Sequence, residues 1–259
     1  IDHLDTIVDF RRYLIMEGAV DAEFQSALAN LGRYGNSFGK SERMRARWSR
    51  KIKPKIKDAR KEPVEYLWFV GDYPSYHPRV QQTAKALHKI LNALGVDFAI
   101  LGPEENSDGD TQRLAGERGL FEVLAEKNGK VFNKYEFGEI ITTDPHAYNA
   151  IKNEYPSLGI EYPVKHYTQF LAERLEDLKP QLKGNGEVKV TYHDPCYLGR
   201  ANGVYDEPRA LLEAIPGVEL IEMSHHRETS LCCGGGGGGM WLDGFQWEKA
   251  QTRLSEWRV

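Results

Sequence analysis

The chain has 259 residues, of which 41% are hydrophobic and 28% are charged, and its formal net charge at pH 7 is −4. This composition is typical of a folded globular protein, and the negative net charge argues against nucleic acid as a partner. No apolar run reaches the roughly 18 residues that a membrane-spanning helix needs. The chain begins at Ile1 rather than at Met, so we expect it to be a piece of a longer polypeptide.

The first 63 residues are predicted to form a helical and basic connector. Apolar side chains recur there at helical spacing: Leu4, Ile7, Val8, Phe10, Leu14, Ile15, Phe24, Leu28 and Leu31. From position 40 to position 61 the chain carries eleven basic residues and two acidic ones. We interpret this stretch as a solvated helix or linker, with a face turned toward anionic lipid or an acidic partner as the alternative.

Strands and helices alternate in the rest of the chain, which predicts an α/β fold with mainly parallel sheets. In a first half, residues 64–180, strands are expected at 66–70, 96–101 and 139–142, and helices at 80–94, 114–127 and 167–178. A linker is expected at 180–186. In a second half, residues 186–259, strands are expected at 188–192 and 218–223, and a helix at 208–215.

The two halves repeat one another. In each half a strand leads to a key residue, Asp72 or Cys196, and a helix and a second strand follow. Each half then reaches a special turn, which begins at Ser107 in the first half and at Cys232 in the second. The two spans are 35 and 36 positions long. The sequence therefore predicts two pseudo-repeated, three-layer-like α/β halves behind an N-terminal helical segment.

The second half contains all three cysteines of the chain, Cys196, Cys232 and Cys233. An odd number does not suit a secreted disulfide framework, and a disulfide between the two neighbours would be strained. We therefore expect free thiols in a reducing, cytoplasmic setting. An adjacent thiol pair on glycine-rich backbone is a poor core element but a good ligand set for a soft metal or an iron–sulfur cluster.

This half resembles the cysteine-rich CCG domain of heterodisulfide reductase catalytic subunits, glycolate oxidase iron–sulfur subunits, lactate-utilisation proteins and membrane-associated oxidoreductases that link electron-transfer flavoprotein to quinone. The family signature is a cysteine, then Cys-Cys-Gly at one fixed spacing, then Cys-x-x-Cys at a second. Cys196, Cys232, Cys233 and Gly234 match the first two parts. The third part is expected just beyond Val259, so we interpret this half as truncated before its last cysteine pair.

The first half follows the same spacing without cysteines. The five positions that correspond to ligands hold Asp72, Ser107, Asp108, Asp144 and Ala147. Such a set cannot hold an iron–sulfur cluster through thiolates. We expect a vacated pocket with polar filler, bordered by Tyr73, Tyr76, His77 and Tyr148, in a half that acts as a scaffold. The alternative is a hard-metal or acid–base site made by Asp72, Asp108, Asp144 and His146.

The resemblance implies that Cys196, Cys232 and Cys233 bind a 4Fe–4S cluster, of the usual cubane form or of the non-cubane kind seen in heterodisulfide reductases. Zinc is the alternative ion for the same thiolates. Gly234 and Gly235 begin a run of six glycines, which we interpret as backbone that approaches the cluster and directs N–H groups at sulfur. A flexible loop is the simpler alternative.

Polar residues flank the cysteines on both sides. His193, Asp194 and Arg200 lie around Cys196 and either tune the cluster or act as turn and surface residues. His225 and His226 are expected to be exposed.

Through residues 8–14 (VDFRRYL) and 30–36 (NLGRYGN), the N-terminal stretch resembles the segment that follows a ferredoxin-like module in larger members of the family. The resemblance therefore implies an oxidoreductase component that relays electrons between a flavoprotein or ferredoxin module and a quinone or other acceptor. It is closest to the iron–sulfur subunit of electron-transfer-flavoprotein:quinone oxidoreductases. Expected partners are flavoprotein, ferredoxin-module and membrane or quinone subunits at the cytoplasmic face of a membrane. The alternatives are a heterodisulfide or thiol–disulfide reductase subunit and a zinc-stabilised or metal-free interaction module.

Overall fold

The computed structural model describes residues 3–184, 186–242 and 245–256. The strands in these ranges are β1 (Lys57–Asp58), β2 (Val64–Phe69), β3 (Phe98–Ile100), β4 (Phe137–Thr142), β5 (Val164–His166), β6 (Val188–Val190) and β7 (Val218–Leu220). The longer helices are α1 (Leu4–Met16), α2 (Ala22–Tyr34), α4 (Val80–Ala93), α6 (Arg118–Phe132), α10 (Asp206–Glu213) and α11 (Phe245–Glu256). The shorter ones are α3 (Asp72–Tyr76), α5 (Asp110–Ala115), α7 (Pro145–Asn149), α8 (Tyr167–Ala172) and α9 (Leu175–Leu178).

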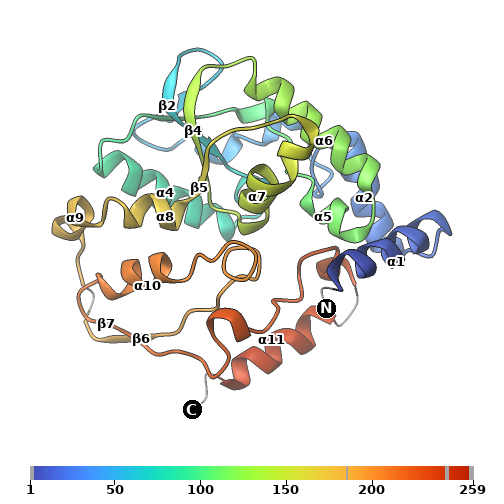
Figure 1. The fold of residues 1–259 in the computed structure, drawn as a ribbon. Helices are drawn as coiled ribbons and strands as arrows, with labels where there is room; N and C mark the ends of the chain where they lie inside the picture. Colours follow the sequence, from blue (N-terminus) through green and yellow to red (C-terminus); the bar gives the residue numbers. More distant parts are fainter. Residues whose placement is uncertain (1–2, 185, 243–244, 257–259) are drawn as a thin grey trace.

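The first half is a three-layer α/β unit around a five-stranded parallel sheet with the order β1-β3-β2-β4-β5 (Figure 1). Alternate residues of the central strand β2 serve different faces of this sheet. Leu67 and Phe69 pack with α6 and α7, whereas Tyr66 and Trp68 pack with α4 and α8. A strand covered on both faces reads as a continuous apolar run, and that is why the sequence predicted it.

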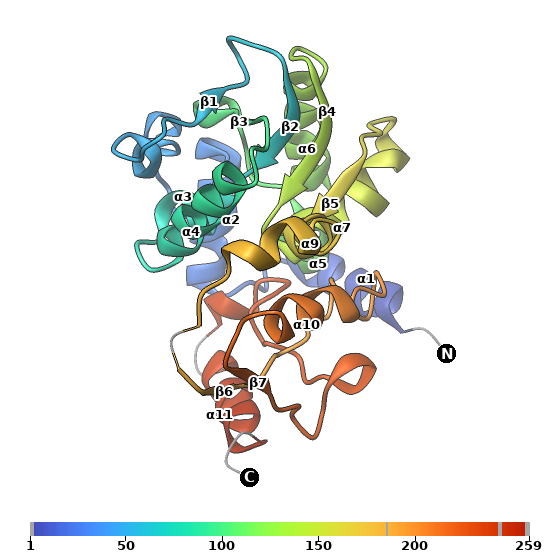
Figure 2. The ribbon, with the colours of Figure 1, turned by 90° about the vertical axis from the view of Figure 1, so that its left-hand side faces the viewer.

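The second half is smaller and contains the parallel pair β6 and β7 with α10. In Figures 1 and 2 it lies beneath the first half, and α10 packs against α8. The α/β fold, its mainly parallel sheets and the N-terminal helical segment are confirmed.

Two helices that were predicted to be continuous are each interrupted in the structure. The helix expected at 114–127 is split into α5 and α6 at Gly116, which has φ 95°. A Cβ atom on this glycine would overlap the backbone nitrogen of Arg12, because α1 crosses close to the break. The helix expected at 167–178 is likewise two short helices, α8 and α9. The linker expected at 180–186 includes Asn185, which lies outside the described residues.

The basic stretch of the connector was expected to be a solvated helix or a linker, and the structure has the second of these forms. The stretch contains the 3-10 turns Glu42–Met44 and Arg47–Ser49, and then β1. Most of its basic side chains are exposed, but Arg45 is buried. Upstream, α1 has the expected helical pattern and yet buries none of its residues. Within the described ranges, no helix combines the length and the apolar character that crossing a membrane requires.

Candidate functional site

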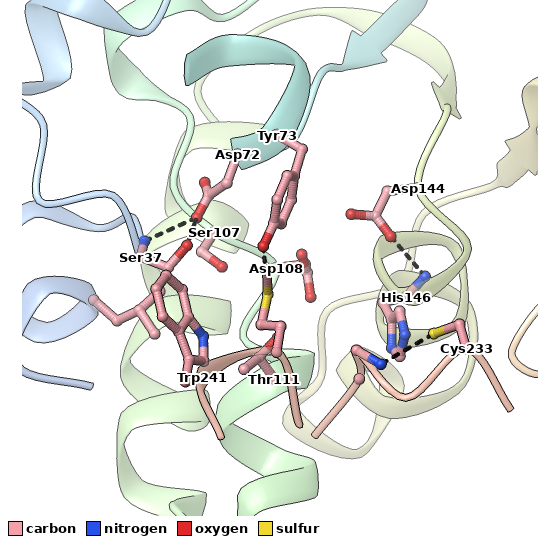
Figure 3. A pocket seen from close by; sticks show the side chains of 14 residues that line it. Ser37, Asp72, Tyr73, Ser107, Asp108, Thr111, Asp144, His146, Cys233 and Trp241 are labelled. Atoms are coloured by element: carbon pink, nitrogen blue, oxygen red, sulfur yellow. Dashed lines mark hydrogen bonds between the residues drawn. The ribbon is translucent and has the colours of Figure 1, made fainter. Parts of the chain in front are cut away.

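A cavity of about 260 Å³ lies where the loops of the first half meet the glycine-rich loop of the second (Figure 3). Asp72 follows β2, Ser107 and Asp108 follow β3, and Asp144 follows β4. The carboxyl ends of parallel strands share one edge of a sheet, so these four residues come together at the cavity. Ala147, the fifth corresponding position, does not reach it and is fully buried in the core beneath.

The aromatic residues expected around this pocket are only partly there. Tyr73 lines the cavity, and its hydroxyl contacts the sulfur of Met240. Tyr148 instead packs against Leu198 and Val204. Tyr76 and His77 do not line the cavity but lie close to residues of the site. The Tyr76 ring centroid is 5.4 Å from the guanidinium carbon of Arg45, which pairs with Asp72, and the His77 ring centroid is 6.5 Å from that of Tyr73.

Asp72 forms an ion pair with the buried Arg45 of the connector. Arg45 Nη2 donates to Asp72 Oδ1 at 2.6 Å, and Nη1 donates to Glu105 Oε1 at 2.8 Å. Glu105 also accepts the backbone N–H groups of Val70 and Gly71, each at 2.9 Å. All three charged residues are buried: Asp72 is 8% exposed, and Arg45 and Glu105 are each 3% exposed. One guanidinium group therefore serves two buried carboxylates, those of Asp72 and Glu105.

Two further titratable groups of the cavity, Asp108 and His146, hold protons unusually well. Burial raises the pKa of Asp108, and the charges of Asp144 and Asp110 raise it further. For His146, burial lowers the pKa. The hydrogen bond of its Nδ1 with Asp110 Oδ2, at 2.6 Å, and the negative charges of Asp110, Asp144 and Asp108 together outweigh burial and raise the pKa to about 9. A protonated carboxyl group and an imidazolium thus border the cavity at neutral pH.

These shifts predict that the free energy of unfolding falls as pH rises. Asp108 and His146 keep protons in the folded chain above their ordinary pKa values of 3.8 and 6.5. Unfolding then releases protons, so higher pH favours the unfolded state until both folded groups have titrated. The His146 contribution is full below its ordinary pKa and is lost as pH rises toward about 9. We expect Asp108→Asn to flatten the decline of the free energy of unfolding, measured by urea unfolding, between about pH 4 and pH 8. An unchanged slope in this variant would contradict the assignment.

The three cysteines come together although they lie in two separate loops. All three are free thiols; Cys232 is exposed, and Cys196 and Cys233 are half-buried. Cys232 contacts both of the others. In the part of the chain that the structure describes, no three or more His, Cys, Asp or Glu side chains are arranged to hold a single metal ion. An iron–sulfur cluster contains several iron atoms, and each thiolate can bind a different one. Three neighbouring thiols that do not surround a single point therefore suit a cluster.

Cys196 and Cys233, which both contact Cys232, have different thiol pKa values. Contact with Cys232 lowers the pKa of Cys196 to about 7, so a large share of this thiol is thiolate at neutral pH. Contact with Cys232 and burial raise the pKa of Cys233 to about 12. The backbone N–H of Gly234 donates to Cys232 Sγ at 3.4 Å, and that of Gly235 donates to Cys233 Sγ at 3.3 Å. Such bonds stabilise negative charge on sulfur.

The glycine run packs closely against the first half and the N-terminal helices, and it is not a loose loop. A Cβ atom on Gly236 would lie 2.8 Å from His146 Cε1, in α7. One on Gly238 would lie 2.6 Å from Phe24 Cε2, in α2, and the glycine between them faces α1 and α5 in the same way. Only residues without a side chain allow the cysteine loop to approach the first half and the N-terminal helices so closely.

Gly238→Ala is therefore expected to lower the free energy of unfolding by about 2 kcal/mol or more. Its φ of 88° disfavours any Cβ atom, and the new methyl group would overlap Phe24. Gly235→Ala is the matched control, because its Cβ atom would make an ordinary contact of 3.7 Å with Cys233 Sγ. Urea unfolding of both variants checks this result. Equal stability of the two variants would show that the close packing carries no energetic weight.

Asp194 organises the second half from a buried position. Both terminal nitrogens of Arg209 donate to its carboxylate, at 2.7 and 2.8 Å, and the backbone N–H of Arg227 donates at 2.7 Å. Burial raises the pKa of Asp194, but these bonds outweigh burial and lower it overall. Asp194 is thus a structural anchor two residues before Cys196, and more than the simple turn residue that we weighed.

His193 and Arg200 connect the two cysteine loops. His193 Nε2 lies 2.8 Å from the carbonyl oxygen of Leu231, and Arg200 Nη2 donates to the carbonyl oxygen of Ser230 at 2.6 Å. Both contacts bind the segment immediately before Cys232. These contacts fix the position of one cysteine loop relative to the other.

The paired histidines downstream lie away from the cavity. His225 is exposed, as expected, and its Nδ1 lies 2.7 Å from Glu256 Oε1. His226 was also expected to be exposed, but it is half-buried. Its ring is held against the chain by a contact of 2.8 Å between Nδ1 and the carbonyl oxygen of Met223.

Sequence reasoning missed several residues of the site. Arg45 was hidden in a run of basic residues, and nothing in the sequence marks it or Glu105 as buried. Asp110, two positions beyond Asp108, could have been included as a further carboxylate of the same turn. Trp241 lines the cavity, and its Nε1 has no hydrogen-bond partner in the described residues.

Comparison with known proteins identifies the family. Residues 66–152 and 190–258 match the model of the CCG cysteine-rich domain. The chain is 46% identical over 249 residues to the probable iron-sulfur-binding oxidoreductase FadF of Bacillus subtilis, with 93% of this chain and 35% of the relative covered. It is 40% identical over 262 residues to the EtfAB:quinone oxidoreductase of Syntrophomonas wolfei, with 96% and 36% covered.

A third relative is one of the polypeptides of the dihydromethanophenazine:CoB–CoM heterodisulfide reductase of Methanosarcina barkeri, 34% identical over 229 residues, with 86% of this chain and 54% of the relative covered. The chain thus spans between about a third and about half of the length of these relatives. No solved structure matches it. The residues that match the family model include all three cysteines at the spacing of the family signature. The chain therefore belongs to the CCG cysteine-rich domain family.

Proposed function

We propose that this chain is the part of an oxidoreductase that holds an iron–sulfur cluster and passes electrons. The observation that carries the proposal is the row of three free thiols, with two backbone N–H groups donating to the sulfur atoms of Cys232 and Cys233. Thiolates are the ligands that such clusters require. The name of the Bacillus subtilis relative, which includes iron-sulfur binding, supports the same cofactor, and none of the three names mentions zinc.

In this proposal Cys196, Cys232 and Cys233 supply three ligands to a 4Fe–4S or non-cubane cluster, and the Cys-x-x-Cys pair expected beyond Val259 completes the set. When bound, the cluster supplies one-electron redox chemistry. Gly234 and Gly235 stabilise charge on the sulfur atoms, and His193 and Arg200 fix the distance between the two loops. The half from 186 to 259 is thus the cofactor-binding unit, and the half from 64 to 180 is a scaffold whose polar cavity replaces a second cluster.

The names of the relatives support a choice of partners. We propose a flavoprotein or ferredoxin module as donor and a quinone as acceptor, in a complex at the cytoplasmic face of a membrane. The name of the Syntrophomonas wolfei relative, which includes Etf and quinone, supports this pair. A heterodisulfide-reducing activity that needs thiol-ligated clusters in both halves is disfavoured, because the first half has no cysteine.

The test is metal and sulfide analysis with electron paramagnetic resonance on the anaerobically purified full-length protein. We expect iron, acid-labile sulfide and a signal that depends on the three cysteines. Colourless, iron-free protein would overturn the proposal.

A further inference from the structure

A second cavity, of about 380 Å³, lies between the basic connector and the sheet of the first half. Its walls come from the connector, from β1 and from the segment that follows β3. Figure 2 shows the connector beside these two neighbouring strands. Both residues of β1 line the cavity, together with Ile100 at the carboxyl end of β3.

The charge of this cavity is strongly positive. Five basic side chains line it: Arg43, Arg50, Lys55, Lys57 and Arg60. Among the described residues, Asp58 is the only acidic one in the lining, and it is neutralised by Arg60, whose Nε and Nη2 donate to its two oxygens at 2.8 and 2.7 Å. Lys57 pairs with Asp97 at 2.8 Å and with Glu62 at 3.6 Å, both outside the lining.

Three cations of the lining are left without a counter-ion. Arg43, Arg50 and Lys55 form no ion pair with any carboxylate in the described part of the chain. All three are exposed, and each can turn toward a ligand in the cavity. Uncompensated positive charge is concentrated here although the whole chain has a net charge of −4. An anion would reduce the repulsion among these side chains.

The floor of the cavity is apolar. Ile56 and Ile100 are 8% and 6% exposed, and Pro103 and Ala46 complete the floor. A ligand that fits both parts has a compact, multiply charged anionic group for the rim and an uncharged portion for the floor. Guanidinium groups bind phosphate oxygens in a bidentate manner, and three cations match a group with two or more negative charges better than a single carboxylate does.

We propose that this cavity binds a phosphate-bearing molecule through Arg43, Arg50 and Lys55. The site does not share a residue with the cysteine loops, so the proposal does not depend on the proposed electron-transfer function. The phosphate belongs either to a soluble ligand or to a lipid headgroup, and the same three side chains recognise both.

The experiment compares two triple variants of the full-length protein that change charge equally. R43Q/R50Q/K55Q removes the unpaired cations of the cavity. K51Q/K53Q/K61Q is the matched control, because these exposed lysines belong to the same connector and do not line the cavity. Binding of inorganic pyrophosphate is measured by calorimetry, and binding to vesicles of phosphatidylcholine with or without phosphatidylglycerol is measured by sedimentation.

We expect the cavity variant to lose about ten-fold or more in affinity, and the control variant to lose about two-fold or less. Pyrophosphate binding that only the cavity variant loses supports a soluble ligand. Vesicle binding that requires phosphatidylglycerol and that only the cavity variant loses supports a lipid headgroup. Equal losses in both variants, or no binding of either probe by the unaltered protein, overturns the proposal.

Discussion

Replacing Cys232 by Ser is expected to remove the iron and sulfide of one cluster from the full-length protein, together with the corresponding paramagnetic signal. Cys232 contacts both Cys196 and Cys233, so its loss interrupts the row of thiols at its centre. A serine hydroxyl keeps its proton at neutral pH and is a much harder donor than a thiolate. Cys196→Ser is expected to give the same result. Iron and sulfide analysis with electron paramagnetic resonance measures the effect.

The first half offers a matched control. Ser107 and Asp108 occupy the positions that correspond to Cys232 and Cys233, and they line the cavity without any neighbouring thiol in their own half. Ser107→Ala and Asp108→Asn are expected to leave the iron content unchanged. Loss of iron in these variants would mean that the first half is part of the cofactor site. Full iron content in Cys232→Ser would remove this thiol from the ligand set.

Replacing Arg45 by Met is expected to lower the free energy of unfolding of the 259-residue chain by about 3–5 kcal/mol. The substitution leaves Asp72 and Glu105 buried without their common cation. Burial raises the pKa of both carboxyl groups, and the Arg45 charge is the main influence that opposes this rise. The measurement is urea unfolding at neutral pH.

The pH dependence separates lost charge balance from lost packing. Without Arg45 the two carboxyl groups can become neutral at low pH, so the deficit of Arg45→Met should shrink as pH falls. A deficit that is constant with pH would point to packing instead. Arg47→Met is the control, because Arg47 is exposed in the same connector, and we expect an effect within about 0.5 kcal/mol. A comparable loss in this control would contradict the special role of Arg45.

Regular patterns made part of the fold predictable. β2 and α4 were found because a continuous apolar run and an apolar stripe each have a single structural interpretation. β5 was missed because it is a three-residue edge strand whose sequence, Val-Lys-His, carries no periodicity. The break between α5 and α6 was missed because its cause lies elsewhere in the chain, in the passage of α1 against Gly116.

The sequence by itself determined the α/β class, the repeat and the spacing of the three cysteines, because these depend on local pattern and on distance along the chain. Only the tertiary structure decided which residues surround the cysteine loops. It placed Arg45 against Asp72, His146 against the glycine run, and Asp110 against His146. These contacts join positions between 27 and 90 residues apart, counted from Arg45 to Asp72 and from His146 to Gly236. Burial and charge pairing over such separations arise from packing and leave no periodic trace in the sequence.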